Sequence, residues 1–147
     1  MKRILSICLF LGVFIFPISC KKEFKLPNQE SQKIIGKWCW VKSTCGWSGE
    51  STPTSTGQNI DLSFDANGNY AKFINGKQDQ KLKYTVSEKY YTNTNSQELY
   101  ITFRNGKIFN HKETGDGNYI RFSGNDSLFT GDGNADDGCA SIYVRKY

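Results

Sequence analysis

Histidine and proline are scarce in this chain of 147 residues, with one and three copies respectively. The one histidine, His111, has no Cys-x-x-Cys pair to complete a zinc site, because the cysteines are too far apart. The Gly-x-Ser-x-Gly elbow of many serine hydrolases is missing as well. No carboxylate lies in an apolar context that would raise its pKa toward acid–base work. We therefore expect no enzyme, no catalytic residue, no bound metal and no cofactor.

Clusters of positive charge are also lacking. Lysine and arginine total 19 against 14 acidic residues, a formal net charge of +5, and Lys2-Arg3 contributes part of it. The remaining basic residues do not alternate with aromatic residues as they do along a nucleic-acid-binding surface. The composition therefore predicts no nucleic-acid partner.

A calcium loop is suggested and then contradicted within Gly131–Gly138. Asp132, Asn134 and Asp136 alternate as oxygen ligands do in an EF-hand. The sixth position, however, is Asp137 where glycine is required, and the twelfth is Tyr143 where glutamate is required. We interpret the segment as a polar turn.

Long hydrophobic runs are limited to the N-terminus. The apolar stretch Ile4–Ile18 is shorter than the roughly 20 residues that span a bilayer, and Pro17 interrupts it. The basic pair Lys2-Arg3 precedes it, as in a secretory signal peptide. The stretch therefore predicts export rather than a membrane-spanning helix.

The signal ends in Pro17-Ile18-Ser19-Cys20. This resembles the lipobox of bacterial lipoproteins, in which the cysteine becomes the lipidated first residue, although Pro17 replaces the usual leucine or valine. The resemblance implies lipidation at Cys20 and a lipid anchor in the bacterial cell envelope, at the outer membrane, facing the periplasm or the surface. The alternative is an ordinary signal peptide cleaved elsewhere. The expected organisation is a signal peptide over 1–19, a lipidated tether over 20–33 and one domain over 34–147.

Helical periodicity is missing from most of the domain. One helical turn is expected within 31–36, with Ser31 as its N-cap. The rest alternates short runs rich in aromatic residues and threonine with glycine-containing turns, which is typical of an all-β domain. Eight strands are expected, over 37–44, 59–64, 69–74, 80–87, 97–104, 118–123, 127–131 and 140–146. Strands with one apolar face can close into an up-and-down antiparallel barrel, and a β-sandwich is the alternative.

The first and last expected strands carry short motifs. Gly36-Lys37-Trp38 opens the first, Tyr143-Val144-Arg145 lies in the last, and Thr52-Pro53 lies in the first long loop. Together they resemble the lipocalin pattern, and more closely the small lipocalin-like domains of bacterial lipoproteins. The resemblance implies an eight-stranded barrel in which Arg145 packs over Trp38 at the closed base. It also implies a role in binding a small molecule.

Three cysteines remain once Cys8 leaves with the signal and Cys20 takes the lipid. An oxidising envelope permits one disulfide and one free thiol among Cys39, Cys45 and Cys139. In the implied barrel the first and last strands are antiparallel neighbours. If Trp38 lies near Lys146, Cys45 faces Cys139, and a disulfide between them is expected, with Cys39 unpaired. The alternative is that all three are reduced.

The longer loops, 45–58, 75–79, 105–117 and 132–138, should share one end of the barrel, its mouth. Side chains expected inside are Trp38, Trp40, Ile60, Leu62, Phe64, Leu82, Tyr84, Val86, Leu99, Ile101 and Phe103. Such a barrel either fills itself or leaves room for a ligand, and both possibilities stay open.

If there is room for a ligand, the expected walls at the mouth are Trp40, Trp47, Ile60, Ile101 and Phe103. Lys42 would then supply a positive charge for an anionic head group. The alternative interpretation is that Lys42 is a solvated surface lysine. The expected function is non-covalent binding of a small hydrophobic or amphipathic molecule at the mouth. The alternative is a filled barrel that acts as a protein-interaction or inhibitor module, presenting its long loops to an envelope or host protein.

Overall fold

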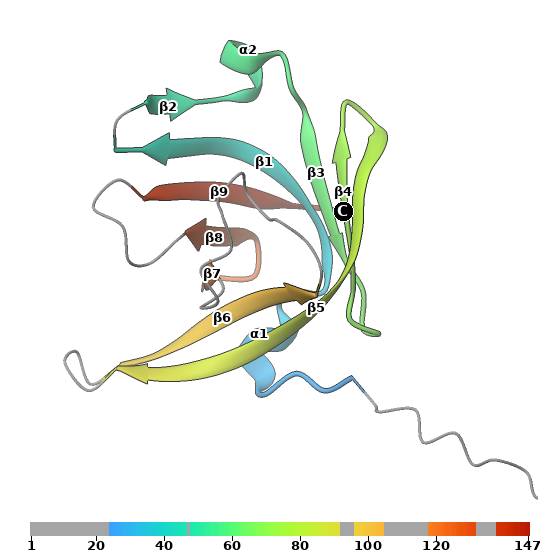
Figure 1. Ribbon diagram of the computed structural model, residues 1–147, viewed down its shortest axis with the longest axis vertical. Coiled ribbons are helices and arrows are strands. Elements are labelled where there is room, and N and C mark those ends of the chain that lie inside the picture. The colour runs from blue at the N-terminus through green and yellow to red at the C-terminus, as the bar shows by residue number, and fades with distance from the viewer. Residues whose placement is uncertain (1–23, 47, 92–95, 105–117, 132–137) are drawn as a thin grey trace, which may run out of the picture.

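The computed structural model describes residues 24–46, 48–91, 96–104, 118–131 and 138–147 (Figure 1). These residues form nine strands and two short helices. The strands are β1 (Gly36–Cys45), β2 (Gly49–Ser51), β3 (Ile60–Phe64), β4 (Asn69–Ile74), β5 (Lys77–Tyr91), β6 (Ser96–Arg104), β7 (Asn118–Ser123), β8 (Ser127–Gly131) and β9 (Cys139–Lys146), and the helices are α1 (Gln29–Gln32) and α2 (Pro53–Thr56).

The sheet closes on itself. From β3 to β9 each strand pairs antiparallel with the next, and β1 pairs with β3 on one side and with β9 on the other. This confirms the eight-stranded up-and-down antiparallel barrel expected from the sequence. The extra strand, β2, pairs with the last three residues of β1, beyond the part of β1 that pairs with β3.

The strand directions define two ends. We call the end where β1 begins the base, and the end where β1 reaches Cys45 the mouth. The N-terminal segment closes the base, because Ile34 is fully buried and Phe24, Leu26 and Ile35 pack against the core. The ring of Phe24 meets that of Tyr84 edge-on at 5.1 Å. Apolar side chains therefore plug the base.

The helix in this segment differs from expectation at its start. Its N-cap is Asn28, whose side chain accepts a hydrogen bond from the Ser31 backbone, while the Ser31 hydroxyl returns a bond to the Asn28 backbone. Ser31 is thus the third residue of a capping box rather than the cap. The sequence placed the N-cap three residues too late, because serine can occupy either position.

Two further elements were not expected. The segment after Cys45 contains β2 and α2, in which Thr52 is the N-cap and Gly57 ends the helix with φ 66°.

Strand β5 is longer than expected. It continues to Tyr91, and so forms a long hairpin with β6 that projects at the base end (Figure 1). The exposed side chain of Tyr90 shows why the sequence ended this strand too early, since its outer residues have no buried face to alternate with.

The core contains the side chains that the alternation predicted. Nine of the eleven expected interior residues are buried, and Ile60 and Leu82 pack partly buried against them. Four further strands, β4, β7, β8 and β9, add buried side chains that were not on that list, namely Tyr70, Ile120, Leu128 and Tyr143.

A candidate ligand site in the barrel interior

The base is fastened by Arg145. Its guanidinium carbon lies 4.2 Å from the centroid of the Trp38 ring, and its nitrogens donate to the carbonyls of Lys33 (2.6 Å), Ile35 (2.9 Å) and Asn125 (2.7 Å). Gly36 makes room for it, because a Cβ there would lie 2.5 Å from Arg145 Nη1. This is the base packing that the resemblance implied for Trp38 and Arg145.

A disulfide joins β1 to β9 at the mouth. Cys45 and Cys139 are bonded, as expected, and Cys39 is a free, half-buried thiol. The register that brings them together differs from the expected one, since Trp38 lies opposite Arg145 rather than Lys146. An irregularity between Trp40 and Lys42 shifts the pairing by one residue and restores the match at Cys45.

The shift after Trp40 also decides where Lys42 points. Lys42 lies opposite Ile142, whereas the inward-facing Tyr143 and Ser141 lie opposite Trp40 and Ser43. Residues opposite one another in an antiparallel pair share a face, so Lys42 is on the outer face. There its Nζ lies 2.6 Å from Glu50 Oε2 of β2. The structure therefore does not bring Lys42 to the interior, and its placement fits the surface-lysine alternative.

The inner face near the mouth carries a group of hydroxyls. Trp40 Nε1 donates to Ser43 Oγ at 2.9 Å, and Ser43 Oγ lies 2.6 Å from Ser141 Oγ. Tyr143, which is buried, hydrogen-bonds with the side chains of Ser141 and Thr130. We call these five residues the hydroxyl cluster. Burial raises the pKa of Tyr143, and the bonds from Ser141 and Thr130 offset only part of that increase, so the phenol stays neutral.

The other predicted wall residues lie on two strands. Ile60 is half-buried at the start of β3, and Ile101 and Phe103 are buried on β6. The Phe103 ring meets that of Tyr70 edge-on, with centroids 4.6 Å apart. Trp47 lies outside the described residues, as do Cys20, His111 and Asp132–Asp137. The structure thus brings Trp40, Ile101 and Phe103 into one buried cluster.

A lysine that the sequence analysis missed lies on the inner face. Lys72 of β4 is opposite Leu62, which is 1% exposed and lies in turn opposite Trp38. These three residues therefore share the inner face of the sheet. The Lys72 side chain is 18% exposed, and its Nζ lies 3.5 Å from Asp79 Oδ2. The alternation of β4 was ambiguous because aromatic residues occur on both of its faces, at Tyr70 and Phe73.

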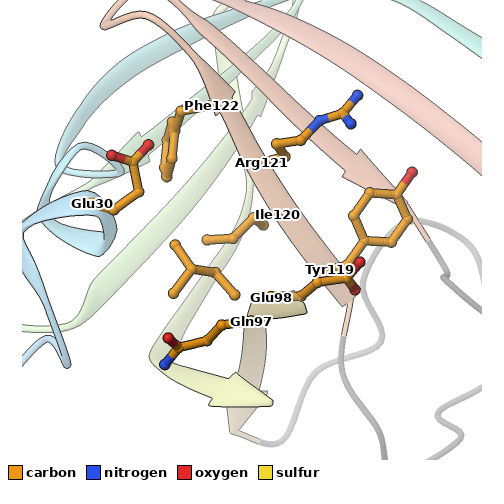
Figure 2. A pocket seen from close by; sticks show the side chains of 8 residues that line it. Glu30, Gln97, Glu98, Tyr119, Ile120, Arg121 and Phe122 are labelled. Carbon is orange, nitrogen blue, oxygen red and sulfur yellow. The ribbon is translucent and has the colours of Figure 1, made fainter. Parts of the chain in front are cut away.

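A separate pocket of about 190 Å³ lies near the base (Figure 2). Strands β6 and β7 pair at only three positions, and below Leu99 and Ile120 they separate. Glu30 of α1 lies beside this gap, together with Gln97, Glu98, Tyr119, Arg121 and Phe122. This volume is below the roughly 300 Å³ typical of small-molecule pockets, and none of the predicted wall residues lines it.

The outer face of β1 holds the free thiol. Burial raises the pKa of Cys39, and the hydrogen bond to Asp61 and its negative charge raise it further, so the thiol stays protonated. Lys146 Nζ lies 2.8 Å from Asp61 Oδ2. Within the described part of the chain, no three histidine, cysteine or acidic side chains gather as metal ligands would.

None of the helices in the described segments has the length and apolar character needed to cross a membrane. Comparisons with known proteins add no assignment: no family model matches the chain, and no curated protein or solved structure matches it.

Proposed function

We propose that this protein is a lipid-anchored binding protein of the bacterial envelope that holds one small hydrophobic or amphipathic molecule in the mouth half of its barrel. The observation that carries the proposal is the uneven polarity of the interior. Apolar side chains plug the base, whereas the hydroxyl cluster lies toward the mouth. Burying polar groups costs free energy that a purely structural core avoids, and small-molecule sites combine apolar walls with a few such groups.

Binding would be driven by burial of apolar surface against Trp40, Ile101 and Phe103, with Trp47 and Ile60 as further walls. The hydroxyl cluster would orient the molecule. This mechanism needs no covalent step. The lipocalin resemblance supports it by analogy, because the motifs that suggested that family occupy matching places in the barrel: Trp38 and Arg145 meet at the base.

Cys20 would anchor the domain to the membrane. It precedes Phe24, the first described residue, by four positions. Labelling cells with radioactive palmitate tests the anchor: we expect label and membrane association in the wild type and neither in Cys20→Ser. An unlabelled wild-type protein would contradict lipidation.

A titration with N-phenyl-1-naphthylamine, a neutral fluorophore, tests the binding. We expect saturable binding near one equivalent by the full mature protein, with Trp40 quenched in proportion. Trp40→Phe should weaken binding, whereas Tyr90→Phe, a change on an exposed part of the β5–β6 hairpin, should not. Fluorescence that rises linearly without saturation would contradict the proposal.

The second candidate is the interaction or inhibitor module, and the β2–α2 segment favours it. The segment is largely exposed outside the closed barrel, and a capping box and the Gly57 cap hold its short helix. Rigid exposed loops lose little entropy on binding a partner. A protein that co-purifies stoichiometrically, and is lost when residues 49–57 are replaced by a glycine–serine linker, would favour this candidate.

A further inference from the structure

Tyr70 of β4 carries a buried hydroxyl with no hydrogen-bond partner among the described residues. The residue is 1% exposed. Its ring packs against those of Phe103 and Phe64, with centroid separations of 4.6 and 5.1 Å. These ring contacts restrict the movement of the Tyr70 side chain.

Packing does not explain this hydroxyl. Phenylalanine would make the same ring contacts without burying an unpaired polar atom, which costs free energy. Tyr84 is the instructive comparison, because it is equally buried and its hydroxyl donates to the Asp65 carbonyl at 2.8 Å. The unpaired Oη of Tyr70 therefore indicates a partner that is not part of the described chain.

The surroundings of Tyr70 limit what that partner is. Burial raises the pKa of Tyr70, and the neighbouring Tyr143 phenol and Asp79 carboxylate raise it further, so the phenol remains a donor at neutral pH. Its partner must offer an acceptor atom. Lys72 is close to Asp79, but 3.5 Å is too long for a well-formed hydrogen bond. The two side chains still form an ion pair, so together they carry no net charge.

We propose that Tyr70 donates the orienting hydrogen bond to the bound molecule, and that this molecule is apolar with one neutral oxygen acceptor, such as a ketone or an alcohol. The inference rests on the proposed function and narrows its ligand class. A carboxylate is disfavoured, because Asp79 would repel it while already compensating the charge of Lys72.

Three probes of nearly equal shape separate the possibilities: butylbenzene, butyrophenone and 4-phenylbutanoate. Each is used to displace N-phenyl-1-naphthylamine from the full mature protein. We expect the ketone to bind about three- to tenfold more tightly than the hydrocarbon, which is the effect of one hydrogen bond, and the carboxylate to bind less tightly than the ketone. In Tyr70→Phe the preference for the ketone over the hydrocarbon should fall to about one.

Tyr84→Phe is the matched control. It should keep the ketone preference and lower the urea midpoint of unfolding, because it removes a hydrogen bond that the protein makes. Tyr70→Phe should not lower that midpoint in the ligand-free protein. A fall as large as that of Tyr84→Phe would show that Tyr70 is already bonded within the chain, and would overturn the inference.

The binding results have distinct meanings. A ketone preference that survives in Tyr70→Phe, or a wild type that binds all three probes equally, overturns the inference and leaves the proposed function standing. A wild type that binds neither the fluorophore nor any probe overturns both.

Discussion

Arg145 and Trp38 form a stacked pair, 4.2 Å from guanidinium carbon to ring centroid, that joins the last strand to the first. The same guanidinium donates to the carbonyls of Lys33 and Ile35, in the segment that plugs the base. One side chain therefore holds the β1–β9 strand pair and the N-terminal segment that closes the base. Removing it should destabilise both.

Arg145→Lys is expected to destabilise the protein by about 2 kcal/mol, because a single ammonium cannot serve three carbonyls and stack at once. Urea unfolding measures the change. Arg121→Lys is the control: Arg121 also lies over a ring, that of Phe129 at 5.4 Å, but on the exposed surface. Arg121→Lys should change the free energy of unfolding by no more than about 0.5 kcal/mol. Equal losses from the two substitutions would contradict the role given to Arg145.

Gly36→Ala is expected to lower the free energy of unfolding by about 2 kcal/mol. Its φ of 139° is one that other residues rarely adopt, and the new Cβ would displace Arg145. Gly124→Ala, at φ 63° with nothing within 4 Å, carries only the backbone penalty of about 1 kcal/mol. Thermal unfolding compares the two variants. A larger loss at Gly124 would count against the close approach of Arg145 to Gly36.

Breaking the Cys45–Cys139 disulfide should lower the free energy of unfolding by about 2–4 kcal/mol, since the bond restricts the unfolded chain. Chemical denaturation of the wild type with and without dithiothreitol measures the loss. The Cys45→Ala/Cys139→Ala variant should show the same loss and no further response to dithiothreitol. A wild type whose stability is unchanged by reduction would be inconsistent with this bond.

Asp65 should make stability depend on pH in the acidic range. Burial alone would raise its pKa, but the side chain and backbone N–H of Asn69, together with the N–H of Asn67, lower it below 3.8. A lowered pKa in the folded state gives stability that is fully present above the ordinary value and is lost as the pH falls through the folded one. Asp65→Asn should therefore be less stable than the wild type at pH 7. Urea titrations should show that the difference in free energy of unfolding between the two proteins becomes smaller below about pH 4. A constant gap would refute this assignment.

The sequence was sufficient for the strands that alternate cleanly. Ile60, Leu62 and Phe64 identify β3, and Leu82, Tyr84 and Val86 identify the barrel part of β5, because each set faces one core. Helix α2 was missed although Thr52, Pro53 and Gly57 are its cap, first residue and terminator. Those signals were present, but four residues carry no helical period.

The polar part of the site could not be predicted in the same way. A one-residue irregularity after Trp40 turns Lys42 outward and Ser43 inward, and nothing in the sequence marks that shift. Lys72 is inward only because β4 pairs with β3 in one register, with Leu62 opposite it. Which face of the sheet these side chains occupy depends on the pairing register between strands that are distant in the sequence. The outward position of Lys42 and the inward position of Lys72 therefore could not be read from local alternation.

Native mass spectrometry of the mature protein, purified from its own membranes, tests the central claim most directly. We predict a lipidated chain carrying one small neutral molecule, lost when the protein is unfolded, and reduced in occupancy by Trp40→Phe. A chain that carries no small molecule and is found instead with a stoichiometric protein partner would contradict the account.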